Sequence, residues 1–359
     1  MTHSSTQIIL KNAPIKDINL EWDQPTSTFE IKHIELPDLE DGQVLIKTLY
    51  ISNDPAQRPW MQKGLDPKRS YVKPTVDGET VRSVTIVEIL ESKSGKFKVG
   101  DLAIGRLFWA DYAIANENEI FTKIDQSLGV PIPYFISYVG ITGLTAYFGL
   151  TEIFGLKVGG EAPVIAISAA SGGVGCVAVQ LAKHVFGSVK VIGISGTDEK
   201  CKWVESLGAD ICVNYTKPDF HEQLTKAVGD EGIDLYFDNV GGEILSFILT
   251  KINKYGKVAA CGSISGYNDY EKIKVTNWGE VIAQRITLSG FIVSDYAAKF
   301  PEAIGTISQA IQTGKVQTSS GLHIEDISNE EDKIKLVPGI WKQLFSSAKP
   351  NGKLLTKFA

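Results

Sequence analysis

The second half of the chain alternates between short apolar runs and amphipathic segments. Five apolar runs have the length and composition of buried strands, at 163–168, 189–194, 211–214, 233–238 and 256–261. Between them, apolar positions recur with the period of a helix at 173–186, 199–207 and 220–228. A further run at 286–293 has the pattern of a last strand. This alternation predicts an α/β fold, a doubly wound parallel sheet with helices on both faces.

The first third of the chain has the pattern of antiparallel β structure. Runs rich in β-branched residues at 44–51 and 81–90 are separated by Gly-containing turn signals such as Glu40-Asp41-Gly42. They predict a barrel-like or sandwich-like domain, and periodicity does not choose between the two.

The last part of the chain does not continue the βαβ rhythm. It predicts a helix at 300–313, a strand at 323–327, a helix at 330–346 and a strand at 353–358. We expect this tail to fold back onto the N-terminal domain. The expected domains are therefore 1–134 with 318–359, and 135–317.

Composition narrows the possible functions. The 359 residues carry a net charge of −6, which argues against a nucleic-acid partner. Neither a signal-peptide pattern nor an apolar run of membrane-spanning length is visible, so we expect a cytoplasmic protein without a membrane partner. The first 175 residues contain no cysteine and only His3 and His33 as imidazoles. We therefore expect no zinc site there, and no metal.

The sharpest local motif is a glycine-rich turn between the predicted strand 163–168 and the helix that follows. Gly172 allows the turn, Gly173 allows close approach of a pyrophosphate, and Gly175 allows the helix to pack on the strand. The amide groups at the helix start face an anion. This context predicts dinucleotide binding by residues of the turn, namely Ala170, Gly172, Gly173, Val174 and Gly175.

The end of the next strand indicates which dinucleotide binds. An NAD site places a carboxylate there, against the ribose 2′-hydroxyl. Here Ser195 and Gly196 occupy that position, and Lys200 follows on the first helical turn. Tyr215, after the third strand, adds a hydroxyl group. The combination favours NADP over NAD, because a lysine attracts the 2′-phosphate that a carboxylate would repel.

Ordered motifs along most of the chain resemble one enzyme family. They include Tyr50-Ile51-Ser52-Asn53-Asp54-Pro55, the stretches 139–150, 168–175 and 195–200, and Tyr236-Phe237-Asp238-Asn239-Val240-Gly241-Gly242-Glu243. The chain resembles the zinc-independent medium-chain reductases that include leukotriene B4 dehydrogenase/prostaglandin reductase and plant alkenal double-bond reductases. The resemblance implies a Rossmann domain inserted in a GroES-like β-barrel domain. It also implies NADPH as hydride donor and α,β-unsaturated aldehydes or ketones as substrates, with hydride delivered to the β-carbon.

The resemblance also implies roles for single residues. Lys200 and Tyr215 are expected at the 2′-phosphate, Thr145 near the nicotinamide and Asn239 on the cofactor side. Tyr267 is expected to donate a hydrogen bond to the substrate carbonyl, with Tyr50 as a second candidate donor. Two departures from the family pattern stand out: Ala56 replaces an aromatic residue, and Pro350 and Asn351 fill the stretch in which the family has a cofactor-binding asparagine.

Other functions remain open at this stage. The sequence is also compatible with a quinone reductase of the same superfamily or with a zinc-free alcohol dehydrogenase. A third alternative is a protein that has lost catalytic activity and binds NADPH in a structural or regulatory role. We further expect a homodimer, because the apolar strand at 286–293 would leave a pairing edge on the nucleotide-binding sheet.

Overall fold

The computed structural model describes residues 3–160, 163–346 and 349–359. The chain divides into two compact units. The first comprises Met1–Ile136, His323–Pro350 and Leu354–Ala359, and the second comprises Ser137–Leu322 and Asn351–Lys353. The structure thus assigns residues 318–322 and 351–353 to the second unit and residues 135–136 to the first, in each case the opposite of the expected division.

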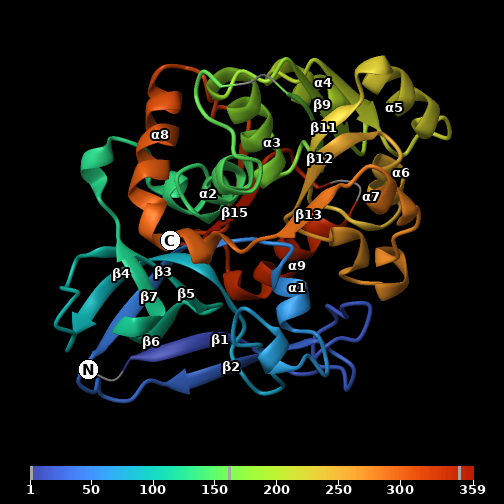
Figure 1. Cartoon of the computed structure of the whole chain (residues 1–359). Helices are drawn as coiled ribbons and strands as arrows, with labels where there is room; N and C mark the ends of the chain where they lie inside the picture. The colour runs from blue at the N-terminus through green and yellow to red at the C-terminus, as the bar shows by residue number, and fades with distance from the viewer. Residues whose placement is uncertain (1–2, 161–162, 347–348) are drawn as a thin grey trace. The chain divides into compact units, whose positions relative to one another are not determined.

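The second unit is built on a six-stranded sheet in which every neighbouring pair of strands is parallel. The strand order is β10-β9-β8-β11-β12-β13, which is the doubly wound order of dinucleotide-binding domains. The predicted α/β fold is confirmed (Figure 1). The strands are β8 (Val164–Ser168), β9 (Lys190–Ser195), β10 (Ile211–Asn214), β11 (Ile233–Asp238), β12 (Ile252–Ala260) and β13 (Thr287–Gly290).

Helices lie before, between and after these strands along the chain. They are α2 (Ile141–Phe148), α3 (Gly173–Gln180), α4 (Asp198–Ser206), α5 (Phe220–Val228), α6 (Gly242–Leu249), α7 (Gly279–Ala283) and α8 (Phe300–Gln312). The predicted helix 173–186 is α-helical only to Gln180 and then widens into a π-helical turn at Leu181–Val185.

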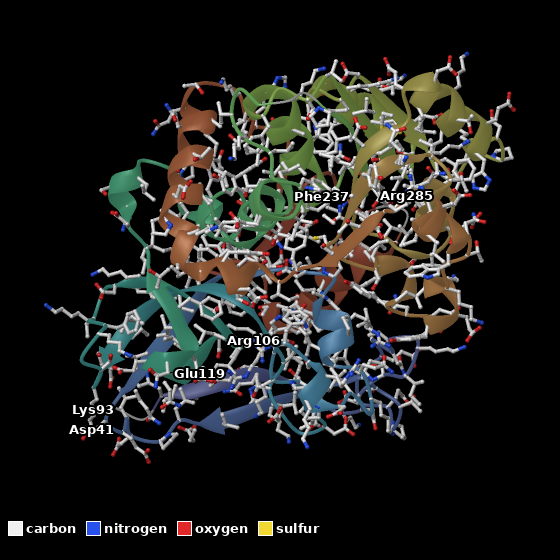
Figure 2. The ribbon with its side chains drawn as sticks, viewed as in Figure 1. Asp41, Lys93, Arg106, Glu119, Phe237 and Arg285 are labelled. Carbon is white, nitrogen blue, oxygen red and sulfur yellow. The ribbon has the colours of Figure 1, made fainter. Side chains whose placement is uncertain are left out.

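The centre of the second unit is apolar and closely packed, because strands buried on both faces carry apolar residues throughout. All five residues of β8 are buried. The fully buried ring of Phe237 on β11 is labelled in Figure 2, and its centroid lies 6.2 Å from the centroids of the Phe154 and Phe291 rings, both in edge-to-face arrangements. A Cβ atom on Gly149 would lie 2.3 Å from the Phe237 ring, so only glycine fits there.

The first unit contains a seven-stranded sheet whose path is β14-β15-β3-β4-β5-β7, with β6 pairing with β3. A separate antiparallel pair, β1 with β2, lies in the same unit. This is the GroES-like domain. Its strands are β1 (Ser4–Leu10), β2 (Phe29–Glu35), β3 (Gln43–Ser52), β4 (Arg82–Ser92), β5 (Leu102–Phe108), β6 (Tyr112–Asn116), β7 (Ile120–Lys123), β14 (Leu322–Asp326) and β15 (Lys353–Lys357).

The tail of the chain completes this sheet. β15 runs antiparallel to β3, with Leu355 opposite Ser52 and Lys357 opposite Tyr50. The predicted helix 330–346 is wrong in extent: α9 covers only Val337–Lys342, between two 3₁₀ turns. Asp332 has a left-handed φ of 50°, and Pro338 has no amide hydrogen to donate, so a longer α-helix is interrupted there.

Three aromatic side chains far apart in the sequence pack together in the core of the first unit. The Trp109 ring lies 5.8 Å from that of Phe29 and 5.9 Å from that of Trp341 on α9. Trp341 is fully buried, and its indole Nε1–H donates to the Asp54 carbonyl at 2.9 Å. Trp341 therefore anchors α9 to the loop that begins after β3.

Replacing Trp341 by alanine should strongly destabilise the first unit. We expect Trp341→Ala to lower the free energy of unfolding by about 3–5 kcal/mol, since it leaves a large cavity and an unpaired carbonyl. Denaturant unfolding followed by circular dichroism measures this. Tyr270→Ala is the control: that residue is 79% exposed, so the change should stay within about 0.5 kcal/mol. Equal effects of the two substitutions would contradict the assigned core.

Candidate active site

Polar residues gather where the parallel strands of the second unit end. Ser168, Ser195, Asn214 and Asp238 each end a strand of the sheet. Carboxyl ends of neighbouring parallel strands meet at one edge, which is where doubly wound folds bind ligands. Every residue that the sequence analysis proposed for the site lies in the second unit except Tyr50, which lies on β3 of the first.

The glycine-rich turn is a tight connection from β8 to α3. Ala169 takes a left-handed φ of 47°, and the Gly172 amide donates to the Ala169 carbonyl at 2.8 Å. A Cβ atom on Gly175 would lie 2.3 Å from that carbonyl oxygen, so the helix start packs directly on the turn. No side chain caps α3 at Gly172. The free amide groups at its first turn suit an anionic ligand such as a pyrophosphate.

Two other segments flank the turn. The Ser171 amide donates to the Ser195 hydroxyl at 3.1 Å, which ties the turn to the end of β9. On the other side the Gly352 amide donates to the Ser171 carbonyl at 2.8 Å. Asn351 lies in the stretch where the sequence departs from the family pattern. It directly precedes Gly352, so it lies beside the turn.

Two residues beside the turn were missed by the sequence analysis. A Cβ atom on Gly173 would lie 3.1 Å from Thr142 Cγ2 and 3.4 Å from Lys353 Cδ. Thr142 lies one helical turn before Thr145 on α2, a spacing that could have pointed to it. Lys353 is 5% exposed and carries no such signal, because only the fold brings it to the turn.

Lys200 is a buried cation that suits a phosphate ligand. The residue is 8% exposed, and burial lowers the pKa of its ammonium below the ordinary value. Within residues 3–160, 163–346 and 349–359, no hydrogen-bond or ion-pair partner faces this ammonium. A partly desolvated charge without a counter-charge is unfavourable, and an anion bound there would compensate it. The site therefore fits the 2′-phosphate of NADPH.

Tyr215 and Gly196 complete this part of the site. A Cβ atom on Gly196 would lie 3.2 Å from the Tyr215 hydroxyl oxygen, so the hydroxyl lies over the glycine. The Tyr215 amide donates to the Ser195 carbonyl at 2.9 Å, and its ring is 44% exposed. The structure thus brings Ser195, Gly196 and Tyr215 together at the ends of β9 and β10.

One carboxylate lies near this region, and its charge is compensated. Asp198 accepts hydrogen bonds from the Asn214 amide and the Lys217 ammonium, both at 2.7 Å. These two contacts hold the pKa of Asp198 below its usual value. The carboxylate is therefore directed toward β10, and Lys217 offsets its repulsion of a phosphate.

The loop after β11 is fixed by hydrogen bonds to β8. The Asn239 side-chain amide donates to the Ser168 carbonyl at 2.8 Å, and its backbone amide donates to the Ser168 hydroxyl at 2.9 Å. Burial raises the pKa of the neighbouring Asp238 carboxyl, which accepts hydrogen bonds from the amides of Val240 and Gly241. Asn239 is thereby held at the carboxyl edge.

Tyr267 lies after β12 at the same edge. Its ring is half-buried, and its hydroxyl oxygen accepts a hydrogen bond from the Ser263 amide at 3.5 Å. Thr145, on α2, donates its hydroxyl hydrogen to the Ile141 carbonyl at 2.7 Å. Tyr50 is half-buried on β3, opposite Ile86 of β4.

The Cys261 thiol at this edge is not ionised near neutral pH, and the described residues form no cluster of metal ligands. Burial, followed by the charge of Asp238, raises the pKa of Cys261 to about 12, so its thiol stays protonated near neutral pH. In the described part of the chain, no three side chains of His, Cys, Asp or Glu lie together as metal ligands.

Both units contain residues that match models of known protein families. Residues 21–123 match the model of the N-terminal domain of oxidoreductase, and residues 173–309 match the model named zinc-binding dehydrogenase. The second name describes the wider family and assigns no zinc to this chain.

Several relatives align over most of the chain. An uncharacterized membrane protein of Saccharomyces cerevisiae, YML131W, is 34% identical over 98% of this chain and 97% of its own. Prostaglandin reductase 1 of Bos taurus is 34% identical over 81% and 84% of the two chains. The NADP(+)-dependent 2-alkenal reductase of Nicotiana tabacum is 33% identical over 91% and 90%. Among the helices described for this chain, none combines the length and apolarity needed to cross a membrane.

A solved structure supports the cofactor. CurA of Vibrio vulnificus in complex with NADPH is 28% identical, with a TM-score of 0.82 over 99% of each chain. This chain is an oxidoreductase that uses NADPH. It belongs to the prostaglandin reductase and alkenal reductase branch of the medium-chain dehydrogenase/reductase family.

Proposed function

We propose that this protein reduces the carbon–carbon double bond of α,β-unsaturated aldehydes or ketones. The observation that carries the proposal is the Tyr267 hydroxyl, which lies at the same sheet edge as the glycine-rich turn. The names of the bovine and tobacco relatives support the same substrate class.

The chain's own residues account for cofactor binding in this proposal. Gly172, Gly173 and Gly175, with Ala170 and Val174, form the pyrophosphate turn. Lys200 supplies the charge for the 2′-phosphate, with Ser195, Gly196 and Tyr215 around it. Thr145, Asn239 and Asn351 line the remaining length of the dinucleotide.

Tyr267 is the proposed donor for the reaction. When bound, NADPH supplies a hydride for the β-carbon of the substrate. Negative charge then develops on the substrate carbonyl oxygen, and a fixed hydroxyl donor stabilises it. Tyr50 is proposed as a second donor from the first unit, and solvent water as the source of the α-carbon proton. No thiolate is needed, in agreement with the raised pKa of Cys261.

A direct comparison of substrates tests the proposal. With NADPH, a 2-alkenal should be consumed and the saturated aldehyde should appear as product, with the carbonyl intact. We expect the same rate after dialysis against a chelator, since we propose zinc independence. Faster consumption of a quinone than of any enal or enone would favour a quinone reductase. Binding of NADPH without its oxidation across a panel of enones would indicate a retired enzyme.

The same assay examines Tyr267. Tyr267→Phe should lower kcat for the alkenal about 10²-fold, since one donor to the developing charge is lost, while the KM for NADPH stays unchanged. Tyr270→Phe is the matched control, because Tyr270 is 79% exposed and three residues away. An unchanged kcat in Tyr267→Phe would remove the residue from the mechanism.

The proposed contact between Lys200 and the 2′-phosphate should determine the preference for NADPH over NADH. Lys200→Ala should raise the KM for NADPH about 10- to 100-fold, the loss of one charged hydrogen bond, and leave the KM for NADH nearly unchanged. Because burial lowers the pKa of Lys200, NADPH affinity of the native protein should fall as the pH rises into the alkaline range. Lys202→Ala, on the exposed side of α4, is the control. Equal effects on both dinucleotides would contradict the assigned phosphate contact.

We also propose a cytoplasmic homodimer that pairs through β13, the edge strand of the nucleotide-binding sheet. Large exposed side chains lie nearby in the sequence, with Trp278 56% and Ile282 74% exposed. Light scattering should give twice the 39.1 kDa of one chain. Ile282→Lys should yield monomers, whereas Val99→Lys in the first unit should not. A monomeric native protein would refute the proposal.

A further inference from the structure

Two cysteines meet beside the proposed phosphate site, and the mechanism above uses neither. The Cys212 thiol donates a hydrogen bond to the Cys201 sulfur, with 3.0 Å between the two Sγ atoms. Cys201 is on α4, directly after Lys200, and Cys212 is on β10. Cys201 is 6% exposed and Cys212 is partly exposed.

The surrounding structure holds the two sulfur atoms in place. α4 and β10 are joined on either side of them, by the Asn214–Asp198 hydrogen bond of 2.7 Å and by the Cys212 amide, which donates to the Glu205 carboxylate at 2.9 Å. Below them, a Cβ atom on Gly193 would lie 3.1 Å from Cys212 Sγ. The two Sγ atoms are 3.0 Å apart. A disulfide bond of about 2.05 Å therefore requires them to approach each other by about 1 Å.

The two thiols differ in reactivity. The hydrogen bond from Cys212 lowers the pKa of Cys201, although burial opposes the shift. The same hydrogen bond, together with burial, raises the pKa of Cys212. The thiolate is the reactive form of cysteine, so Cys201 is the first nucleophile and Cys212 is the resolving thiol. The other two cysteines are inert by comparison, since burial raises the pKa of both Cys176 and Cys261 to about 12.

We propose that Cys201 and Cys212 form a peroxide-sensitive dithiol whose oxidation to a disulfide weakens NADPH binding. The Cys201 thiolate attacks one oxygen of a hydroperoxide, the O–O bond breaks, and the sulfenic acid forms as the other oxygen leaves and takes a proton. Cys212 sulfur then attacks the Cys201 sulfur. The S–O bond breaks, water leaves with the Cys212 proton, and the S–S bond forms. With hydrogen peroxide, two thiols and one peroxide give one disulfide and two waters.

The consequence for the cofactor rests on the phosphate contact proposed above for Lys200. Lys200 precedes Cys201 on the first turn of α4, and the chain continues from Cys212 along β10 to Tyr215. Drawing the two sulfurs together displaces these flanking residues. An ångström of misplacement is enough to weaken a positioned contact, and we expect a loss of about tenfold in NADPH affinity, with NADH affected less.

Hydrogen peroxide on the full-length protein tests both steps. Intact-mass spectrometry should show a loss of about 2 Da, for two hydrogens, and digestion without reductant should give one cross-linked peptide pair containing Cys201 and Cys212. Dithiothreitol should restore the mass and the NADPH affinity, measured by fluorescence titration. Cys201→Ser and Cys212→Ser should each abolish the mass loss, while Cys261→Ser retains it.

Different failures have different meanings. If both thiols are oxidised separately, or no cross-linked pair forms, the dithiol is refuted. If the disulfide forms and NADPH affinity is unchanged, the coupling to the phosphate site is refuted. A reduced protein that does not prefer NADPH over NADH would instead refute the proposed role of Lys200, and the mass measurement still decides on the dithiol.

Discussion

The parallel alignment of β8 to β12 is the constraint on which the site depends. Because these strands run in one direction, residues that follow them meet at a single edge although they are far apart in the sequence. The backbone supplies the uncapped amides at the start of α3 that we propose as the pyrophosphate site, and the residues after the strands supply the side chains. The chemistry of this edge is therefore determined by a few loop residues on a rigid sheet.

Electrostatics at this edge is arranged to favour an added anion. Lys200 is buried without a counter-charge among the described residues, whereas the nearby Asp198 is paired with Asn214 and Lys217. Because Lys200 is not held in an ion pair with any described residue, no such pair has to be broken before the phosphate binds. Such preorganisation increases affinity because less must be reordered on binding.

Much of this organisation was predictable from the sequence, for reasons that are local. The glycine-rich turn is recognisable because only glycine fits at Gly175, and the NADPH preference follows from residues within one turn of a strand end. The contribution of Lys353 was not predictable, since it depends on which segments pack beside the turn, whereas the spacing from Thr145 could have pointed to Thr142. The break in the predicted helix 330–346 reflects a left-handed backbone at Asp332, which periodicity does not reveal. The Cys201–Cys212 contact likewise depends on the distance between a helix and a strand.

The C-terminal segment has a consequence for the order of folding during synthesis. Gly352 bonds to Ser171 beside the turn, and β15 pairs with β3 in the first unit. Neither structure is complete until residues beyond 350 have left the ribosome. The nascent chain therefore carries an open edge on β3 and an incomplete glycine-rich turn until residues 351–357 are available to fold.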